Sequence, residues 1–242
     1  MFSNCCFVLP AVLAGISCLA GAAFADAGSI GASQGIIVKP GQKVAFLGAS
    51  ITDFGWSNPK GYIRLTVNSL AANGVVIVPI PAGIGGNTSA DMLARLDRDV
   101  ISKKPDWMTV DAGGNDVWHN SVQFDQYMVN MTAIVDKAQA AGIHVIIQTC
   151  TPITEDLNDA FNVKMAYYNQ FLVYLASQKH CVLADLNGDE VAIIKTKTGT
   201  DNILTTDGVH MNDRGNQVMA AGLLKAMGLT DAQISQTTPA AQ

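Results

Sequence analysis

Several polar side chains in this chain are of the types that carry out nucleophilic acyl transfer. Ser50 follows a glycine by two positions, Asn115 follows two consecutive glycines, and Asp207 precedes His210 by three positions. A serine hydroxyl is too basic to attack an ester unaided and needs an adjacent base, most often a histidine. Since glycine, serine and asparagine also occupy ordinary turns for backbone reasons, this chemistry requires a fold that brings the side chains together.

The elements that must position these residues alternate between strands and helices along the chain. Five short apolar runs rich in β-branched residues predict strands. These runs are residues 44–47, 75–80, 107–110, 143–148 and 182–186. Helical spacing between them predicts helices, including one in which Thr88 and Asp91 form a capping pair. The other predicted helices are residues 61–72, 124–141, 162–177 and 213–227.

This alternation predicts a three-layer α/β fold, in which helices cover both faces of a mainly five-stranded parallel sheet. Ligands bind such sheets at the carboxyl ends of the strands. The loops that follow the first three predicted strands, residues 48–52, 83–88 and 113–116, are all glycine-rich and carry polar residues. A fourth segment, residues 207–210, stands before the last predicted helix. The predicted topology therefore places the first three loops at one edge of the sheet.

These four segments, in this order, resemble the four sequence blocks of the SGNH, or GDSL-type, serine hydrolases. The resemblance extends from about residue 44 to residue 228 and implies that family's flavodoxin-like fold and an ester hydrolase activity without a cofactor. By this resemblance, Ser50 is the nucleophile, His210 its general base, and Asp207 the acid that orients and stabilises the imidazole. The oxyanion would be bound by the backbone N–H groups of Ser50 and Gly86 and by the side-chain amide of Asn115.

The first two motifs each contain one position that the family pattern leaves in question. Ala49 stands where the family usually has aspartate, so the loop of the nucleophile lacks a carboxylate that could hydrogen-bond to its neighbours. Gly86 is assigned to the oxyanion hole in preference to Gly85, because it fits the family's Ile-x-Gly-x-Thr spacing. A residue without a side chain also lets the substrate approach its N–H closely. The residues of the triad and of the oxyanion hole are present, but the sequence leaves open which residues hold the loop of Ser50 in place.

Other residues near the motifs have structural as well as functional interpretations. Trp56 and Trp118 follow the first and third motifs and are candidate substrate-binding residues, although tryptophan equally often packs in a core. Asp116 is interpreted as holding its loop. No His-x-His or His-x-x-x-His pair accompanies the acidic residues, so no metal site is predicted. The glycine-rich loop at residues 83–87 lacks the spacing of a phosphate-binding loop.

The composition predicts one globular domain. Of the 242 residues, 49% are hydrophobic and 14% charged, which is enough apolar material for a single full core. The net charge is −5 and the Lys and Arg residues are scattered, so the chain lacks the basic patch that nucleic acid or an anionic membrane surface would need. The domain is predicted to span residues 26–242, with a core at about 43–228 and a polar, frayed tail at 230–242.

The first 25 residues differ from the rest and are predicted to be a cleaved signal peptide. Residues 7–19 are almost wholly apolar, and Ala23 and Ala25 are the small residues that signal peptidase reads, so cleavage is expected after Ala25. The apolar stretch is shorter than the ~20 residues of a spanning helix, so no stable membrane insertion is expected after cleavage. The mature protein would be secreted or periplasmic. In it, Cys150 and Cys181 are predicted at opposite ends of neighbouring strands and therefore unpaired.

Together these observations predict a secreted carboxylic ester hydrolase that works through a Ser-His-Asp acyl-enzyme. Secretion, modest size and the absence of a recognisable apolar lid favour short acyl groups, above all acetyl esters of carbohydrates. The expected partner is thus a small-molecule or glycan ester. Two alternatives stay open: a long-chain thioesterase or lysophospholipase, and a non-catalytic carbohydrate- or ligand-binding relative whose only support is Ala49.

Overall fold

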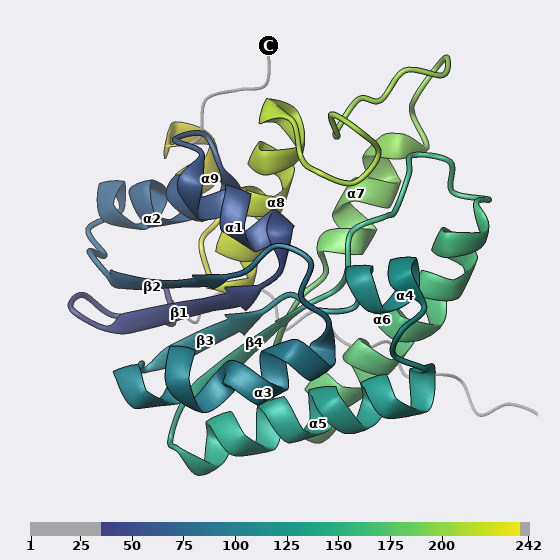
Figure 1. Ribbon diagram of the computed structural model, residues 1–242. Coiled ribbons are helices and arrows are strands. Elements are labelled where there is room, and N and C mark those ends of the chain that lie inside the picture. The colour runs from purple at the N-terminus through teal and green to yellow at the C-terminus, as the bar shows by residue number, and fades with distance from the viewer. Residues whose placement is uncertain (1–34, 238–242) are drawn as a thin grey trace, which may run out of the picture. The chain divides into compact units, whose positions relative to one another are not determined.

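A parallel β-sheet lies at the centre of the part of the chain that the computed structural model describes, residues 35–237 (Figure 1). Its strands are β1 (Lys43–Gly48), β2 (Val78–Gly83), β3 (Trp107–Val110), β4 (His144–Gln148) and β5 (Val182–Ala184). They are arranged in the order β2-β1-β3-β4-β5, and every neighbouring pair is parallel. The predicted α/β class with a five-stranded parallel sheet is confirmed.

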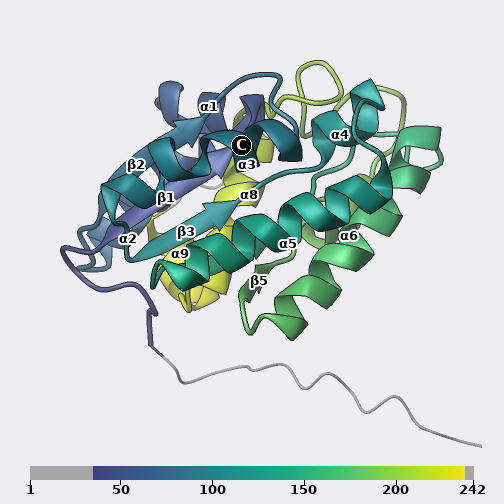
Figure 2. The same cartoon turned by 60° about the horizontal axis from the view of Figure 1, so that its bottom comes forward.

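Helices cover both faces of this sheet, as Figures 1 and 2 show. One face carries α3 (Ser89–Asp99), α5 (Phe124–Ala140) and α6 (Ala160–Gln178). The other carries α2 (Tyr62–Ala72), α8 (Asp213–Ala226) and α9 (Asp231–Thr237). The shorter elements are α1 (Ser50–Ser57), α4 (Gly114–His119), α7 (Leu186–Ile194) and the 3₁₀ turn η1 (Ile101–Lys103). The three predicted layers are therefore present.

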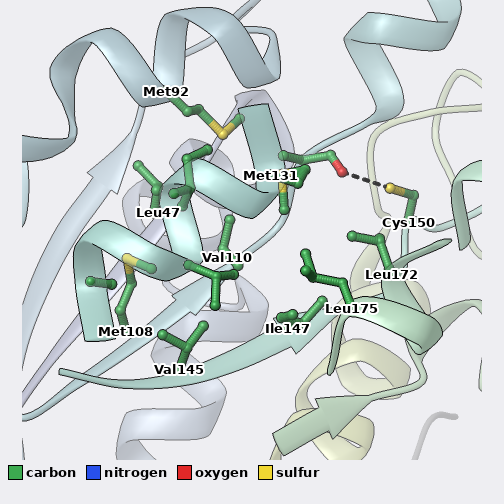
Figure 3. Close-up of a cluster of buried hydrophobic side chains, with 14 of the residues drawn as sticks. Leu47, Met92, Met108, Val110, Met131, Val145, Ile147, Cys150, Leu172 and Leu175 are labelled. Atoms are coloured by element: carbon green, nitrogen blue, oxygen red, sulfur yellow. Dashed lines mark hydrogen bonds between the residues drawn. The ribbon is translucent and has the colours of Figure 1, made fainter. Parts of the chain in front are cut away.

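The side chains of β1 alternate between two hydrophobic clusters, one on each face of the sheet. Ala45 and Leu47 belong to the cluster under α3, α5 and α6, whereas Val44 and Phe46 belong to the cluster under α2 and α8. Figure 3 shows part of the first cluster, where side chains of β3 and β4 lie near Leu175 of α6. Burial on both faces explains the continuous apolar runs of the strands. It also gives the loops at the strand ends a rigid support.

The second strand is displaced from its predicted position. The apolar run predicts a strand over residues 75–80, but β2 begins at Val78 and includes Pro79 and Pro81. Proline cannot donate to a sheet ladder and is tolerated on edge strands, and β2 is the edge strand beside β1. The displacement places Gly83 at the end of β2, level with the end of β1.

The long helices begin and end close to their predicted limits. Thr88 and Asp91 form a capping box at the start of α3, as their spacing predicts. The sequence does not predict α1, although this helix carries Ser50. Its eight residues make only about two turns and include Gly55, so the segment is too short for periodicity to give a signal.

The two ends of the chain differ in what the structure describes. Residues 231–237 form α9, so the predicted fraying of the tail is wrong for them. The physical reason is local capping, since Gln233 Oε1 accepts hydrogen bonds from the N–H and hydroxyl of Thr230, together with burial of Ile234 beside α2 and α8. The predicted signal peptide, residues 1–25, lies outside the described residues. Within residues 35–237, no helix has both the length and the apolar character required to cross a membrane.

Candidate active site

Ser50 is the first residue of α1, at the carboxyl end of β1. The chain turns there after Gly48, where a Cβ atom would lie only 1.9 Å from Thr52 Oγ1, so a larger residue would collide with the helix. The N–H of Asp53 donates to the carbonyl of Ala49 at 2.9 Å and closes the first helical turn. The glycine thus lets the strand pass directly into the helix, and Ser50 lines a cavity at the edge of the sheet.

His210 and Asp207 lie beside Ser50. His210 Nε2 is 2.9 Å from Ser50 Oγ, and His210 Nδ1 is 2.7 Å from Asp207 Oδ2. Asp207 Oδ1 accepts hydrogen bonds from the backbone N–H groups of Val209 and His210 at 2.9 and 2.7 Å. Burial alone would raise the pKa of Asp207, but these hydrogen bonds outweigh it and lower the pKa to about 2. Asp207 is therefore ionised at neutral pH, next to the imidazole.

The segment before Asp207 is held by Glu155, a residue outside the four sequence motifs. Its side chain is only 1% exposed. The carboxylate accepts hydrogen bonds from the backbone N–H groups of Ile203, Leu204 and Thr205 at 2.7, 2.7 and 2.9 Å, and from the hydroxyl of Thr205 at 3.0 Å. Burial would raise the pKa of Glu155, but these donors lower it. No local sequence pattern predicts this role, because about 50 residues separate Glu155 from the backbone groups that it binds.

The predicted oxyanion donors lie around the same cavity as Ser50. Gly86 lines the cavity and has a φ of +78°, a left-handed conformation that suits glycine. Asn115, on α4, also lines the cavity and donates an amide hydrogen bond to the carbonyl of Asn87 at 2.9 Å. Since a side-chain amide has two N–H donors, Asn115 has another for a substrate. Gly85, the alternative to Gly86, is not among the lining residues.

Asp116 holds its loop, in agreement with the interpretation from sequence. Its buried carboxylate accepts hydrogen bonds from the backbone N–H of Ser89 at 3.0 and 3.2 Å and from the Ser89 hydroxyl at 2.5 Å. Asn130 of α5 donates to the same hydroxyl at 3.0 Å. These bonds tie the third motif to the first turn of α3.

The cavity over Ser50 has a volume of about 520 Å³ and two aromatic walls. Trp118, of which 46% is exposed, stacks on Phe161 with ring centroids 4.8 Å apart. Phe54 meets the ring of His210 edge-on, with centroids 5.1 Å apart. Trp118 and Phe54 both line the cavity, so one of the two predicted substrate-binding tryptophans lies where a substrate would enter.

Trp56, the other predicted substrate-binding tryptophan, lies elsewhere. It is not among the residues that line the cavity and packs at the edge of the cluster under α2 and α8. The guanidinium carbon of Arg64 is 3.7 Å from the centre of its ring, and Arg64 Nε donates to its carbonyl at 2.8 Å. These contacts give Trp56 a packing environment.

A comparison with known protein families decides the class of this chain. Residues 46–218 match the GDSL-like Lipase/Acylhydrolase family. The chain belongs to this family. It is therefore a serine ester hydrolase, as the order of its four motifs predicts.

The similar proteins include acetylxylan esterases and, over 44% of this chain at 31% identity, Esterase TesA from Pseudomonas aeruginosa. An acetylxylan esterase from Geobacillus stearothermophilus is 28% identical over 209 residues, which are 78% of this chain and 94% of that protein. The crystal structure of Axe2, an acetylxylan esterase from Geobacillus stearothermophilus, has a TM-score of 0.73 at 27% identity and covers 80% of this chain and 97% of that one. The acetyl xylan esterase AlAXEase has a TM-score of 0.70 at 33% identity, over 76% of this chain and 98% of that one. Solved catalytic mutants of Axe2 replace a serine, an aspartate or a histidine by alanine, the last two being three positions apart.

This GDSL-like hydrolase departs from the family pattern at Ala49. Ala49 is the N-cap residue of α1, and its side chain makes no capping hydrogen bond. Alanine is a poor N-cap, so α1, which carries Ser50, begins without a side-chain cap at that position. Asp111, at the end of β3, lines the same cavity, and the Thr52 hydroxyl donates to Asp111 Oδ2 at a long 3.4 Å. Burial raises the pKa of Asp111 to about 6.

Cys150 lines the cavity but is not a second nucleophile. Cys150 and Cys181 are both free, as predicted. The Cys150 thiol donates to the carbonyl of Ala112 at 2.9 Å, and burial raises its pKa well above the usual value, so it stays protonated and unreactive. Among residues 35–237, no group of three or more His, Cys, Asp and Glu side chains is arranged to hold a metal ion.

Proposed function

We propose that this chain is a carbohydrate acetyl esterase that works through an acyl-enzyme on Ser50. The observation that carries the proposal is the continuous contact from Asp207 through His210 to the Ser50 hydroxyl, at the edge of the cavity. Its volume of about 520 Å³ lies in the range of small-molecule sites and accommodates an acetylated sugar unit. The nearly full-length similarity to acetylxylan esterases supports the same substrate class.

The reaction proceeds in two displacement steps. Ser50 Oγ attacks the acetyl carbonyl carbon while His210 Nε2 takes its proton, and Asp207 stabilises the imidazolium. The oxygen that gains negative charge is bound by the N–H groups of Ser50 and Gly86 and by the Asn115 amide. His210 then protonates the sugar oxygen, which leaves as an alcohol. Water attacks the acetyl-Ser50 ester with His210 again as base, acetate leaves, and the proton returns to Ser50.

The aromatic walls of the cavity favour a sugar as the alcohol part of the ester. Trp118 is held flat by its stack on Phe161 and exposes its other side, as a platform for the apolar face of a sugar ring. Phe54 stands at the His210 side of the cavity. Between these walls, the sugar would lie with its acetyl group over Ser50.

The decisive experiment labels the folded protein with a fluorophosphonate and follows the hydrolysis of p-nitrophenyl acetate. We expect one adduct, on Ser50, and a loss of at least ~1,000-fold in kcat for Ser50→Ala. Ser121→Ala, in an exposed loop position, is the control and keeps wild-type activity. Absence of an adduct would contradict the mechanism and favour a non-catalytic relative. Hydrolysis by Ser50→Ala at the wild-type rate would show that Ser50 is not the nucleophile.

A second experiment tests the substrate class. We expect Trp118→Ala to raise KM for acetylated xylo-oligosaccharides several-fold and to leave KM for p-nitrophenyl acetate unchanged, because only the sugar reaches the platform. Tyr174→Ala removes an exposed aromatic side chain outside the cavity and serves as control. A rate that rises with acyl length from acetyl to long-chain p-nitrophenyl esters would contradict the proposal and favour a lipid hydrolase or thioesterase.

We also propose that the protein is exported and that its mature form begins at Asp26. The support is the apolar segment at residues 7–19 and the small residues Ala23 and Ala25 before the cleavage point. The test is expression of the full chain, cell fractionation and mass measurement of the intact protein. Recovery of the uncleaved chain from the cytoplasm would contradict export.

A further inference from the structure

Arg95 is a buried cation on the apolar side of α3, the helix that lies beside α5 on one face of the sheet (Figure 2). Its side chain is 7% exposed, and its neighbours on this side of the helix are Met92 and Leu96, both buried. Burying a guanidinium is costly unless its N–H groups are hydrogen-bonded. The positions of its acceptors therefore show which parts of the fold depend on it.

The three nitrogen atoms of Arg95 donate to three different places. Nη2 donates to the carbonyl oxygen of Gly48 at 2.9 Å, and Nε donates to Asn87 Oδ1 at 2.6 Å. Nη1 donates to Asp99 Oδ2, one turn along the same helix, at 3.2 Å. Gly48 ends β1, and Asn87 belongs to the loop after β2, so one planar group bonds to the first and second motif loops together.

The two acceptors in the motif loops, Gly48 and Asn87, lie next to proposed oxyanion donors along the chain. Gly48 stands two residues before Ser50, and Asn87 follows Gly86 in the chain. The backbone carbonyl of Asn87 in turn accepts the hydrogen bond from the Asn115 side chain. Arg95 is thus linked to the segments that carry all three proposed donors, although it is not among the residues that line the cavity.

We propose that Arg95 is a positioning residue for the oxyanion hole. This inference rests on the proposed function. Stabilisation of an oxyanion depends on donors that are fixed before the reaction starts, and these donors come from three separate loops. The guanidinium is rigid and planar, so it sets the distance between the carbonyl of Gly48 and the side chain of Asn87. With Ala49 unable to cap the nucleophile helix, Arg95 supplies a tie between the nucleophile's loop and its neighbour.

Arg98 offers a matched control on the same helix. It is three positions further on and exposed, and it donates only to Asp99, with Nε and Nη2 at 2.6 and 3.0 Å from the two carboxylate oxygens. Arg95→Met and Arg98→Met therefore make the same chemical change on α3. Only the first removes the hydrogen bonds to the motif loops.

The first test compares kcat and KM of these two variants for p-nitrophenyl acetate. We expect Arg95→Met to lower kcat about 10- to 100-fold with KM within about 3-fold of wild type, because the donors act on the transition state more than on the bound ester. Arg98→Met keeps both constants within about 2-fold. A kcat of Arg95→Met as high as that of Arg98→Met would overturn the proposal, as would full activity in Arg95→Lys, which keeps the charge without the planar fork.

A double-mutant cycle with Asn115→Ala separates positioning from general loss of structure. If Arg95 acts through the oxyanion donors, the kcat loss of the double variant is smaller than the product of the two single losses, because the same stabilisation cannot be lost twice. Independent, multiplicative losses would overturn the proposal. If Arg95→Met fails to fold, Asn87→Ala replaces it in the cycle, since it removes the Oδ1 acceptor and keeps the carbonyl that binds Asn115.

Failure of this inference differs from failure of the proposed function. If the proposed function is wrong, the wild-type protein gives no fluorophosphonate adduct on Ser50, or Ser50→Ala keeps its activity. If only the role of Arg95 is wrong, Ser50 is labelled and required, and Arg95→Met behaves as Arg98→Met does.

Discussion

The site has two halves, the loops after β1, β2 and β3 with Ser50 (the nucleophile's half) and residues 203–210 with His210 (the histidine's half). Each contains a carboxylate, partly buried Asp111 in the first and buried Glu155 beside the second, and the two differ in how many hydrogen bonds they receive. Asp111 follows β3, lines the same cavity as Ser50 and receives one long hydrogen bond, from the Thr52 hydroxyl at 3.4 Å. Glu155 lies behind the segment that carries Asp207 and His210. It receives four hydrogen bonds of 2.7 to 3.0 Å and a fifth, from Lys197 Nζ, at 3.5 Å. Burial therefore raises the pKa of Asp111, whereas the donors lower the pKa of Glu155.

The difference follows from how each half is built. The loops after β1, β2 and β3 are held by a sheet packed on both faces, and the cation Arg95 binds the carbonyl oxygen of Gly48 at the end of β1. The residues between α7 and α8 have little regular structure, with one isolated bridge between Thr205 and Met211. The groups left over there are backbone N–H donors, which an anion must bind. The buried cation Arg95 and the buried anion Asp116 both hold loops in the half that contains Ser50, whereas the anion Glu155 holds the segment before Asp207 and His210.

The largest effect on stability is expected from Glu155→Gln. The new amide group would place N–H donors against the backbone N–H groups of residues 203–205, and a buried unsatisfied donor costs about 1–3 kcal/mol. With more than one donor affected, we expect a loss of about 4 kcal/mol in the free energy of unfolding near neutral pH. Folding lowers the pKa of Glu155. Its contribution to the free energy of unfolding is therefore fully present above the pKa of the unfolded chain, and it is lost as the pH falls through the pKa of the folded protein.

The measurement is denaturant unfolding of both proteins between about pH 3 and pH 8, with labelling of Ser50 as a probe of the site. The difference in the free energy of unfolding between wild type and Glu155→Gln should become smaller toward pH 3. Asp156→Asn is the matched control, since Asp156 is the next residue and its carboxylate accepts one exposed backbone hydrogen bond. Equal stability of the two variants at neutral pH would refute the bracing role of Glu155.

Asp111→Asn is expected to act in the opposite direction. The folded protein raises the pKa of this carboxyl from 3.8 to about 6, so the wild type is most stable with Asp111 protonated and loses stability as the pH rises between these values. Asparagine resembles the protonated form. The shift of about 2 units corresponds to about 3 kcal/mol. We expect Asp111→Asn to be more stable than wild type by up to about 3 kcal/mol at pH 8 and equal to it near pH 4.

Unfolding at a series of pH values tests this expectation with the same assay as for Glu155. At pH 8, Glu155→Gln should be less stable and Asp111→Asn more stable than wild type. This result would support the difference in hydrogen bonding between the two carboxylates. If Asp111→Asn is less stable than wild type at pH 8, the comparison is wrong, because the folded protein then stabilises the ionised carboxylate of Asp111.

The sequence predicts the nucleophile's half better than the histidine's half. Strand ends and glycine-rich loops are local patterns, so the positions of Ser50, Gly86 and Asn115 at the edge of the sheet follow from periodicity and topology. The motif at residues 207–210 is recognisable, but the contacts that hold it are not, because Glu155 and its partners meet only through tertiary packing.

Arg95 is an intermediate case, because the sequence does contain a signal for it. An arginine between Met92 and Leu96 stands on the apolar side of a predicted helix, and a charge in such a position needs partners inside the protein. What the sequence does not contain is the identity of the partners. Its bond to Gly48 spans 47 residues and depends on where α3 crosses the end of β1.

The smallest change in stability is expected from alanine at one left-handed glycine in each half. Gly86 has a φ of +78° with no atom within 4 Å of an added Cβ, and Gly208 has a φ of +92° with Thr154 Cα at 3.5 Å. Neither site is crowded, so each substitution costs only the left-handed backbone, about 1 to 2 kcal/mol. Gly86→Ala and Gly208→Ala should therefore lower the free energy of unfolding by similar amounts.

Activity should separate the same two variants. The methyl group at position 86 would stand beside the N–H that we propose binds the oxyanion, so kcat should fall further in Gly86→Ala than in Gly208→Ala. The carbonyl of Gly208 instead accepts a hydrogen bond from the N–H of Thr154. Equal losses of kcat would mean that the backbone at Gly208 controls His210 as closely as Gly86 controls the oxyanion. The histidine's half would then be as rigidly set as the nucleophile's half, in spite of its irregular backbone.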